Sequence, residues 1–237
     1  MSLGYCVEVF DSTIDTSESG PVPGKPVTQP GEPGDLVCTR PFPTMPLYFY
    51  SDSDGKKYFN SYFAKYTNVW THGDFIQIHP TTKQVIFLGR ADGVLNPSGV
   101  RFGSAEIYSV IERHFPSEIS DTICVGQRRP TDSDESVLLF VLMKPGHKFT
   151  PSLIRRIKHA IGTECSKRHV PRYVFETKEI PTTVNLKKVE LPVKQIVSGK
   201  KVKASGTLAN PQSLEYYYRF AEDGNLVVLE EQDRAKL

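Results

Sequence analysis

Asp74 and Arg90 are the first residues whose types suit chemistry on a bound ligand. Asp74 closes the segment Trp70–Asp74, of sequence WTHGD, and Arg90 follows an apolar run. A carboxylate can accept charge-assisted hydrogen bonds from two neighbouring hydroxyl groups, and arginine presents a planar, permanently charged fork to anions. In isolation, Asp74 is explained better as a cap on the turn after Gly73, and Arg90 as a surface arginine that ends a strand.

A second group of candidate residues lies shortly after this pair. Asp92 and Gly93 form a dipeptide that is typical of a tight turn, although glycine also gives the backbone the freedom that a hinge needs. Gly99 permits close approach of the backbone to a ligand, and Arg101 can offer positive charge to a phosphate. The alternative for Gly99 is one more turn.

Lys187 is a third candidate, in the late segment Pro181–Lys187 of sequence PTTVNLK. A mobile ammonium can offset the repulsion between two anions and stabilise negative charge in a transition state. The ordinary explanation of the pair Lys187 and Lys188 is a solvated basic surface. Leu186 comes directly before Lys187, and its β-carbon would restrict the loop if the backbone there needs a positive φ.

Charge is unevenly distributed along the chain. The net charge is +2, yet residues 151–203 contain 13 Lys and Arg against 4 Glu and no Asp, a local charge of +9. This segment would suit a polyanionic ligand that carries phosphates, or it is simply a solvated basic face. A nucleic-acid binder is a weaker alternative on this composition, and salt-dependent retention of RNA or DNA would test it.

Several classes of protein are disfavoured by the sequence. No run of about 18 apolar residues is present to cross a membrane, and the first residues lack the basic start and apolar stretch of a signal peptide. We therefore predict a cytoplasmic protein with no membrane association. The cysteines show no C-x-x-C pair and the histidines no metal-ligand spacing, so no metal site is predicted.

Alternation and turn residues predict a β-rich first region. A short strand falls within the first ten residues, a turn-rich stretch covers residues 11–34, and another strand covers Asp35–Thr39. Two alternating runs, Asp74–His79 and Gln84–Leu88, predict a hairpin. The aromatic stretch between Tyr48 and Trp70 favours packing over the stacking of nucleobases.

From Ser104 the period changes to that of a helix, with Ile107, Val110, Ile111 and Phe115 on one face. Thr150 and Pro151 are a typical helix start. The later elements are predicted as strands 119–125 and 136–143, a helix from residue 151 to about 168, a strand at 173–177 and a helix at 189–197. Residues 200–237 are expected to form a peripheral tail, although a helix could begin at Asn210.

Three segments resemble the adenylate-forming acyl-CoA synthetase superfamily when they are taken together. They are Trp70–Asp74, the stretch from Gly89 through Arg101 to Glu106, and Pro181–Lys187. The segments Gly34–Pro41, Leu95–Ser104 and Lys167–Pro171 are most similar to the acetoacetyl-CoA synthetase family, with the acetyl-CoA and propionyl-CoA synthetases as close alternatives. The resemblance covers most of the chain and implies the C-terminal portion of such an enzyme.

The resemblance implies roles for the candidates before residue 95. Asp74 matches the aspartate that accepts hydrogen bonds from both ribose hydroxyls of ATP, and Arg90 the arginine on the ribose and phosphate side of the nucleotide. Asp92 and Gly93 match the hinge about which the C-terminal domain reorients between two catalytic poses.

It also implies roles for the later candidates. Gly99 and Arg101 match the loop that lines the CoA channel, and Lys187 the lysine that bridges the substrate carboxylate and the α-phosphate during adenylation. The family usually has glycine before this lysine, whereas this chain has Leu186. The implied substrates are acetoacetate, ATP with Mg²⁺ as phosphate counter-ion, and CoA.

The expected architecture is α+β. Residues 1–91 would be the β-rich remnant of a large adenylation domain, 92–199 a mobile lid domain of about three strands flanked by helices, and 200–237 a peripheral tail. The superfamily's Ser/Thr/Gly-rich phosphate loop, which ends in Pro-Lys, has no counterpart in the chain. We therefore expect the chain to be incomplete alone. The alternative is a non-catalytic truncated paralogue that binds a full-length partner or a separate adenylation domain.

Overall fold

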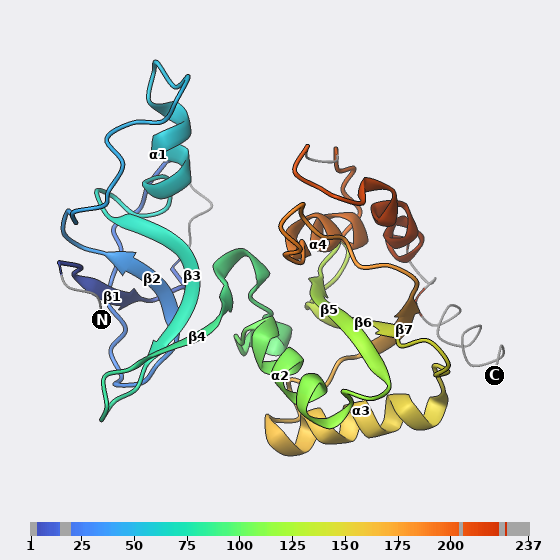
Figure 1. Cartoon of the computed structure of the whole chain (residues 1–237). Coiled ribbons are helices and arrows are strands. Elements are labelled where there is room, and N and C mark those ends of the chain that lie inside the picture. Colours follow the sequence, from blue (N-terminus) through green and yellow to red (C-terminus); the bar gives the residue numbers. More distant parts are fainter. Residues whose placement is uncertain (1–3, 15–19, 204–205, 223–225, 227–237) are drawn as a thin grey trace. The chain divides into compact units, whose positions relative to one another are not determined.

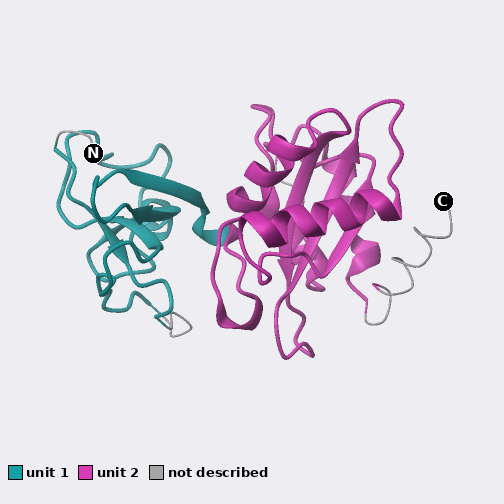
Figure 2. Ribbon diagram, turned by 90° about the horizontal axis from the view of Figure 1, so that it is seen from below, with its two compact units in different colours: residues 1–92 teal, residues 93–237 magenta. Residues whose placement is uncertain are grey.

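The computed structural model describes residues 4–14, 20–203, 206–222 and 226. The chain divides into two compact units, Met1–Asp92 and Gly93–Leu237, which are coloured separately in Figure 2. The division falls between the two residues expected to form the hinge, one residue later than the boundary predicted from the sequence. Both units contain strands and helices, and the fold class is α+β as predicted.

Unit 1 is built on a four-stranded antiparallel sheet in the order β1-β2-β3-β4 (Figure 1). The strands are β1 (Val7–Phe10), β2 (Gly34–Cys38), β3 (Trp70–Ile78) and β4 (Val85–Arg90). The predicted hairpin is present as β3 and β4. Strand β3 begins at Trp70, four residues before the predicted start at Asp74. The prediction started late because the polar His72 and the glycine at 73 interrupt the apolar alternation.

The aromatic stretch of unit 1 packs against the first residue of β3. The ring of Trp70 is stacked on Tyr62, with centroids 3.6 Å apart and planes at 14°. Tyr62 ends helix α1 (Lys56–Tyr62), which was not predicted. No residue of α1 is fully buried, and the half-buried Tyr58 and Tyr62 are its one aromatic pair at a spacing of four residues, which is too short a pattern to predict a helix. The packing explanation of the aromatic residues is therefore the one the structure supports.

Unit 2 contains a three-stranded sheet in the order β5-β6-β7. The strands are β5 (Ile119–Gln127), β6 (Ser136–Met143) and β7 (Tyr173–Thr177). Strands β5 and β6 are antiparallel, whereas β6 and β7 are parallel. The crossover between β6 and β7 is helix α3 (Pro151–Glu164), as a parallel connection requires.

Alternating side chains of this sheet form two separate cores. Leu139 and Val141 of β6 lie among buried residues of α2 (Ser104–His114) and α3, whereas Leu138 and Phe140 lie among buried residues that follow β7. The second layer consists of α4 (Glu190–Val197) and the 3₁₀ helix η3 (Pro211–Phe220); Figure 1 shows the sheet between the two layers. The period of two along each strand produces this arrangement.

The predicted start of α3 is confirmed in detail. The Thr150 hydroxyl accepts a hydrogen bond from Leu153 N at 3.2 Å, and Pro151 occupies the first turn, where no amide donor is needed. The helix ends at Glu164, however, rather than near Arg168. At the start of α2, Glu106 Oε1 accepts from Gly103 N at 3.0 Å, so this glutamate caps the helix.

The prediction that residues 200–237 form a peripheral tail is wrong for most of the described part of that segment. Leu214, Tyr217 and Phe220 of η3 are buried in the core beside Phe140 and Phe175. Their spacing of three residues places them on one face of a 3₁₀ helix, and the helix that the sequence allowed from Asn210 is present as Pro211–Phe220. Residues 206–222 are therefore part of unit 2. Most of the remaining tail lies outside the described residues.

No helix within the described ranges has both the length and the apolar character needed to span a bilayer.

Candidate functional site

Asp74 and Arg90 face each other across the β3–β4 hairpin. They are register partners in the two strands, and Arg90 Nη1 donates to Asp74 Oδ1 at 2.9 Å. The Asp74 side chain is 17% exposed and that of Arg90 is 54% exposed. The hairpin thus presents a largely covered carboxylate with one oxygen held by a guanidinium.

Gly73 makes the approach of Arg90 possible. Its φ is +85°, a conformation that L side chains rarely adopt, and a β-carbon built there would lie 2.7 Å from Arg90 Nη2. Arg90 Nη1 also donates to the carbonyl of His72 at 3.4 Å. The guanidinium therefore lies over the glycine backbone, and the short WTHGD segment determines where Arg90 can be.

His72 is a member of this cluster that the sequence analysis gave no role. The indole N–H of Trp70 donates to His72 Nδ1 at 3.3 Å, so in the neutral ring Nε2 carries the proton. This Nε2 lies 3.7 Å from Asp74 Oδ2. The signal in the sequence was the period-two spacing of residues 70, 72 and 74, which places all three side chains on one face of the strand.

The predicted hinge residues lie at the boundary of the two units. Asp92 Oδ1 is 3.7 Å from Arg90 Nε, so this carboxylate belongs to the charge cluster of unit 1. A single 3₁₀ turn, η1 (Ala91–Gly93), includes Asp92, and Gly93 is buried in unit 2. A short connection of this kind confines any rotation between the units to very few backbone torsions.

Gly99 and Arg101 lie in a small hairpin of unit 2 that is closed by the pairing of Leu95 with Phe102. Gly99 has φ +79° and open space around its α-carbon, whereas Arg101 is half-buried. The hairpin borders an open hollow of about 500 Å³ that includes Pro97 and Ser98 together with the basic residues Lys167, Arg168 and Arg172. Neither Gly99 nor Arg101 lines this hollow.

Lys187 stands at the end of a tight turn between β7 and α4. Leu186 N donates to Thr183 O at 2.8 Å, and Thr183 N donates to Lys187 O at 2.8 Å. Thr183 Oγ1 also accepts from Lys187 N at 3.2 Å. The Lys187 side chain is exposed and makes no ion pair with any residue that the structure describes. The turn therefore presents a free ammonium to solvent.

Leu186 occupies the left-handed region, with φ +60°. This is the positive φ that would restrict a branched side chain, and the side chain is 83% exposed, so no packing compensates for it. A non-glycine residue in this conformation costs on the order of 1–2 kcal/mol. The position where the family usually has glycine thus has a backbone conformation that favours glycine.

The candidate residues are divided between the two units. Asp74, Arg90 and Asp92 form one cluster in unit 1, and Lys187 lies in unit 2 with Gly93 and the hairpin of Gly99. Within the described ranges no group of three side chains suits a metal ion.

No family model matches the chain. Acetoacetyl-CoA synthetase from Gallus gallus is 48% identical to it over 221 residues, which is 93% of this chain and 31% of that protein. The chain resembles the C-terminal part of acetoacetyl-CoA synthetase. The family member from Rattus norvegicus is 45% identical over 216 residues, covering 91% of this chain and 30% of its own length. This is the family that the motifs predicted.

Solved structures agree with the family. The acetoacetyl-CoA synthetase from Streptomyces lividans is 34% identical, with a TM-score of 0.77, over 92% of this chain and 30% of that protein. A benzoate CoA ligase from Burkholderia xenovorans, at 18% identity and TM-score 0.60 over 81% of this chain and 34% of that protein, shows the fold alone. The chain spans about a third of the length of these relatives, which agrees with the prediction of a C-terminal portion.

The relatives do not all act on the same acid. Malonamoyl-CoA synthetase vrtB from Penicillium aethiopicum is 47% identical over 223 residues, covering 93% of this chain and 28% of that protein. This identity is close to the 48% of the chicken acetoacetyl-CoA synthetase. Similarity within this portion of the acetoacetyl-CoA synthetase family therefore does not distinguish the two acids.

Proposed function

We propose that the chain is the lid and ribose edge of a ligase that converts acetoacetate, ATP and CoA to acetoacetyl-CoA, AMP and pyrophosphate. The reaction would proceed through an acyl-adenylate, which the CoA thiol then attacks. The observation that carries the proposal is the combination of the paired Asp74 carboxylate and the unpaired Lys187 ammonium in a chain that is 48% identical to an acetoacetyl-CoA synthetase.

The first half-reaction needs the nucleotide held and two anions brought together. We propose that the two oxygens of Asp74 accept the vicinal ribose hydroxyls, while Arg90 holds the carboxylate in place and faces the phosphate side. Lys187 would lie between the acid's carboxylate and the α-phosphate. Its ammonium lowers their repulsion and stabilises the charge that develops on the phosphate.

The second half-reaction needs a different partner beside the adenylate. We propose that rotation about Asp92 and Gly93 replaces Lys187 with the hairpin of Gly99 and Arg101. Gly99, with open space around it, allows the thin pantetheine arm of CoA to pass close to the backbone. Arg101 would offer positive charge to a CoA phosphate.

The triphosphate and the acid need groups that this chain does not provide. No described cluster of side chains suits Mg²⁺, so we propose that the ion enters as the counter-ion of ATP and is held by a phosphate loop outside this chain. We further propose a cytoplasmic location, which suits four free cysteines.

A specific observation favours association with an adenylation region. Unit 1 exposes large apolar side chains at Leu47, Tyr48 and Tyr50, and Val85, Ile86 and Phe87 are exposed on consecutive positions of the edge strand β4. An unpaired edge strand with apolar residues on both faces is a template for further pairing. We propose that this surface is covered by an adenylation region, encoded either in the same polypeptide or separately.

A chimeric ligase tests the proposed function. This chain would replace the matched region of the chicken enzyme, and acetoacetate-dependent exchange of pyrophosphate into ATP would be measured. We expect activity in the chimera, a loss of about 100-fold in Lys187→Ala, and no exchange by the 237-residue chain alone. The opposite outcome is an active isolated chain, with an exchange activity that Lys187→Ala abolishes. That result would refute the proposal that the chain depends on an adenylation region.

The truncated-paralogue alternative has its own test. The isolated chain would be mixed with a separately expressed adenylation region, and binding measured for the wild type and for Phe87→Lys. A non-catalytic binding module is favoured if Phe87→Lys weakens the binding and the chimera is also inactive. An active chimera would exclude that alternative.

A further inference from the structure

The loop that carries Lys187 is paired with a segment that lies between α4 and η3. Ala209 N donates to Thr182 O at 2.9 Å, and Val184 N donates to Thr207 O at 3.0 Å. Thr183 and Leu208 form an antiparallel bridge between these two bonds. Residues 207–209 therefore form a short antiparallel ladder with residues 182–184, immediately before the Lys187 turn.

Asn210 joins this ladder to the end of the preceding strand. Its Oδ1 accepts from Thr182 N at 2.9 Å, and its Nδ2 donates to Glu179 Oε1 at 2.7 Å and to Ile180 O at 2.9 Å. One amide side chain thus supplies one acceptor and two donors to three successive points of the loop. An aspartate would keep the acceptor but lose both donors and face Glu179 with like charge.

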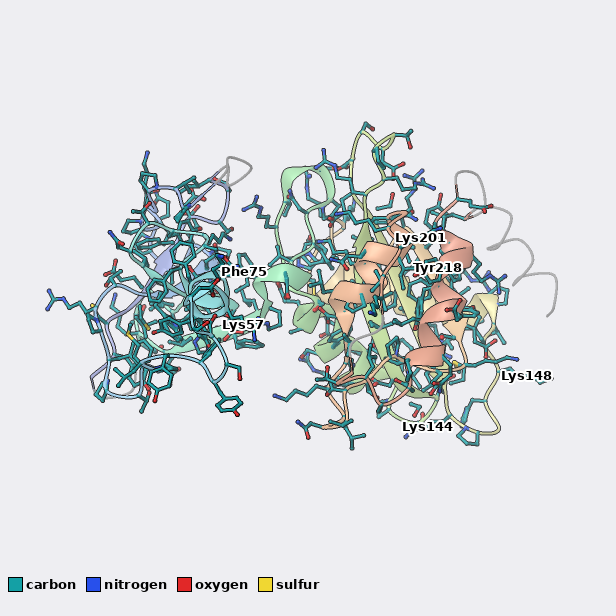
Figure 3. The ribbon with its side chains drawn as sticks, turned by 90° about the horizontal axis from the view of Figure 1, so that it is seen from above. Lys57, Phe75, Lys144, Lys148, Lys201 and Tyr218 are labelled. Atoms are coloured by element: carbon teal, nitrogen blue, oxygen red, sulfur yellow. The ribbon has the colours of Figure 1, made fainter. Side chains whose placement is uncertain are left out.

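The ladder is itself attached to the core. Leu208 is buried, and the Ser213 hydroxyl donates to Asn210 O at 2.6 Å. Tyr217 of η3 donates through its hydroxyl to Glu179 O at 3.2 Å, and the Tyr218 hydroxyl, labelled in Figure 3, accepts from Val202 N at 3.0 Å. The ladder therefore cannot move without disturbing the packed face of the sheet.

The other end of the turn is held by the neighbouring lysine. Lys188 Nζ lies 2.6 Å from Asp121 Oδ1, donates to Thr122 O at 2.9 Å, and stands 4.0 Å from the centre of the Tyr108 ring. Glu190 Oε1 accepts from the Tyr108 hydroxyl at 2.6 Å. Both sides of the turn are therefore bonded to unit 2, and the Lys187 side chain between them is free.

We propose that residues 207–210 are a brace for the Lys187 turn and that Asn210 is a positioning residue for the first half-reaction. The inference rests on the proposed function, because it assumes that Lys187 acts in adenylation. The brace also accounts for Leu186: a left-handed leucine persists where the surrounding structure determines the backbone, and here bonds on both sides of the turn do so. In its absence the turn would open and Lys187 would sample many positions.

Amide hydrogen exchange on the full 237-residue chain tests the brace without reference to activity. In Asn210→Ala, we expect exchange of the Val184, Leu186 and Lys187 amides to accelerate at least tenfold, with the amides of β5, β6 and β7 unchanged. Asn185→Ala, at the exposed tip of the same turn, is the matched control and should leave all of these rates unchanged. Unchanged rates in Asn210→Ala, or equal acceleration throughout unit 2, would overturn the brace.

The chimeric ligase tests whether the brace serves Lys187. We expect Asn210→Ala to slow acetoacetate-dependent pyrophosphate exchange about tenfold, and to leave thioester formation from supplied acyl-adenylate unchanged, because only the first step uses Lys187. Equal losses in both steps would show that Asn210 has a structural role only. Unchanged pyrophosphate exchange would likewise overturn the positioning role. If the wild-type chimera shows no exchange, the proposed function fails while the hydrogen-exchange result still decides the brace.

Discussion

Lys187 and Lys188 are adjacent in the chain, yet the ammonium of Lys187 is free in solvent while that of Lys188 lies 2.6 Å from the Asp121 carboxylate and over the Tyr108 ring. Two residues of the same type thus have different tasks. One is available to a substrate, and the other holds the loop to the sheet.

Alanine substitutions should separate these tasks. Lys188→Ala should lower the free energy of unfolding of unit 2 by about 1 kcal/mol, because it removes a partly buried ion pair and a cation–π contact. Lys187→Ala should change it by less than about 0.5 kcal/mol, as at other exposed positions. Urea unfolding followed by circular dichroism measures both. Equal destabilisation by the two variants would contradict the assignment.

Gly73→Ala should displace Arg90 from Asp74. The new β-carbon would lie 2.7 Å from Arg90 Nη2 at a φ of +85°, so unit 1 should lose on the order of 1–3 kcal/mol of stability and the Asp74–Arg90 pair should open. Trp70, the single tryptophan of the chain, reports this unfolding by fluorescence. Gly55→Ala is the matched control, with φ +68° but open space, and it should leave the pair intact. An equal fall in the pyrophosphate exchange activity of the chimera in both variants would contradict this role of Gly73.

Leu186→Gly should stabilise unit 2 by about 1 kcal/mol, because glycine adopts φ +60° without the steric cost of a β-carbon. Val184→Gly, at an exposed position of the same turn, should instead be neutral or destabilising, since it only adds freedom to the unfolded chain. Thermal unfolding of the two variants measures the difference. A Leu186→Gly protein less stable than the wild type would show that other interactions require the leucine.

Glu118 should make the stability of unit 2 depend on pH. Its two oxygens accept from Arg156 Nη2 at 2.6 Å and Nη1 at 2.8 Å, and these hydrogen bonds hold the pKa of Glu118 below its usual value. The stabilisation is present above the unfolded pKa of about 4.3 and is lost as the pH falls through the lower folded pKa.

Glu118→Gln should therefore cost about 0.5–1 kcal/mol at pH 7. The difference between wild type and variant should vanish in acid, and urea unfolding across a series of pH values measures it. Glu112→Gln is the control, because this exposed glutamate of α2 makes no ion pair with any residue that the structure describes and should show no such trend. A pH-independent difference for Glu118→Gln would point to lost packing rather than lost charge.

Regular burial patterns made most of unit 2 predictable. Strand β6 has the predicted bounds, Ser136–Met143, and β7 has the bounds Tyr173–Thr177, because alternating apolar residues face two cores. Helix α1 is short and has one aromatic pair at helical spacing, too little for a prediction. Helix η3 lies where the sequence allowed a helix from Asn210, but its burial in the core depends on tertiary packing that the local sequence does not indicate.

The motif residues were also identifiable from sequence, since Asp74, Arg90 and Lys187 are recognised by type and spacing along the chain. Their environments were not. His72 turns its Nε2 toward Asp74 only because the Trp70 indole occupies the other ring nitrogen. Asn210 reaches the Lys187 loop across an intervening helix, and nothing in the local sequence of either segment records the other.

The sequence by itself therefore determined the resemblance to acetoacetyl-CoA synthetase, the α+β class and which charged residues are proposed for chemistry, because these depend on residue type and local period. The tertiary structure alone decided which lysine is free, which backbone position carries positive φ, and what holds the lysine loop. Those properties arise from hydrogen bonds and packing between segments far apart in the chain, and such bonds leave no periodic trace in either partner.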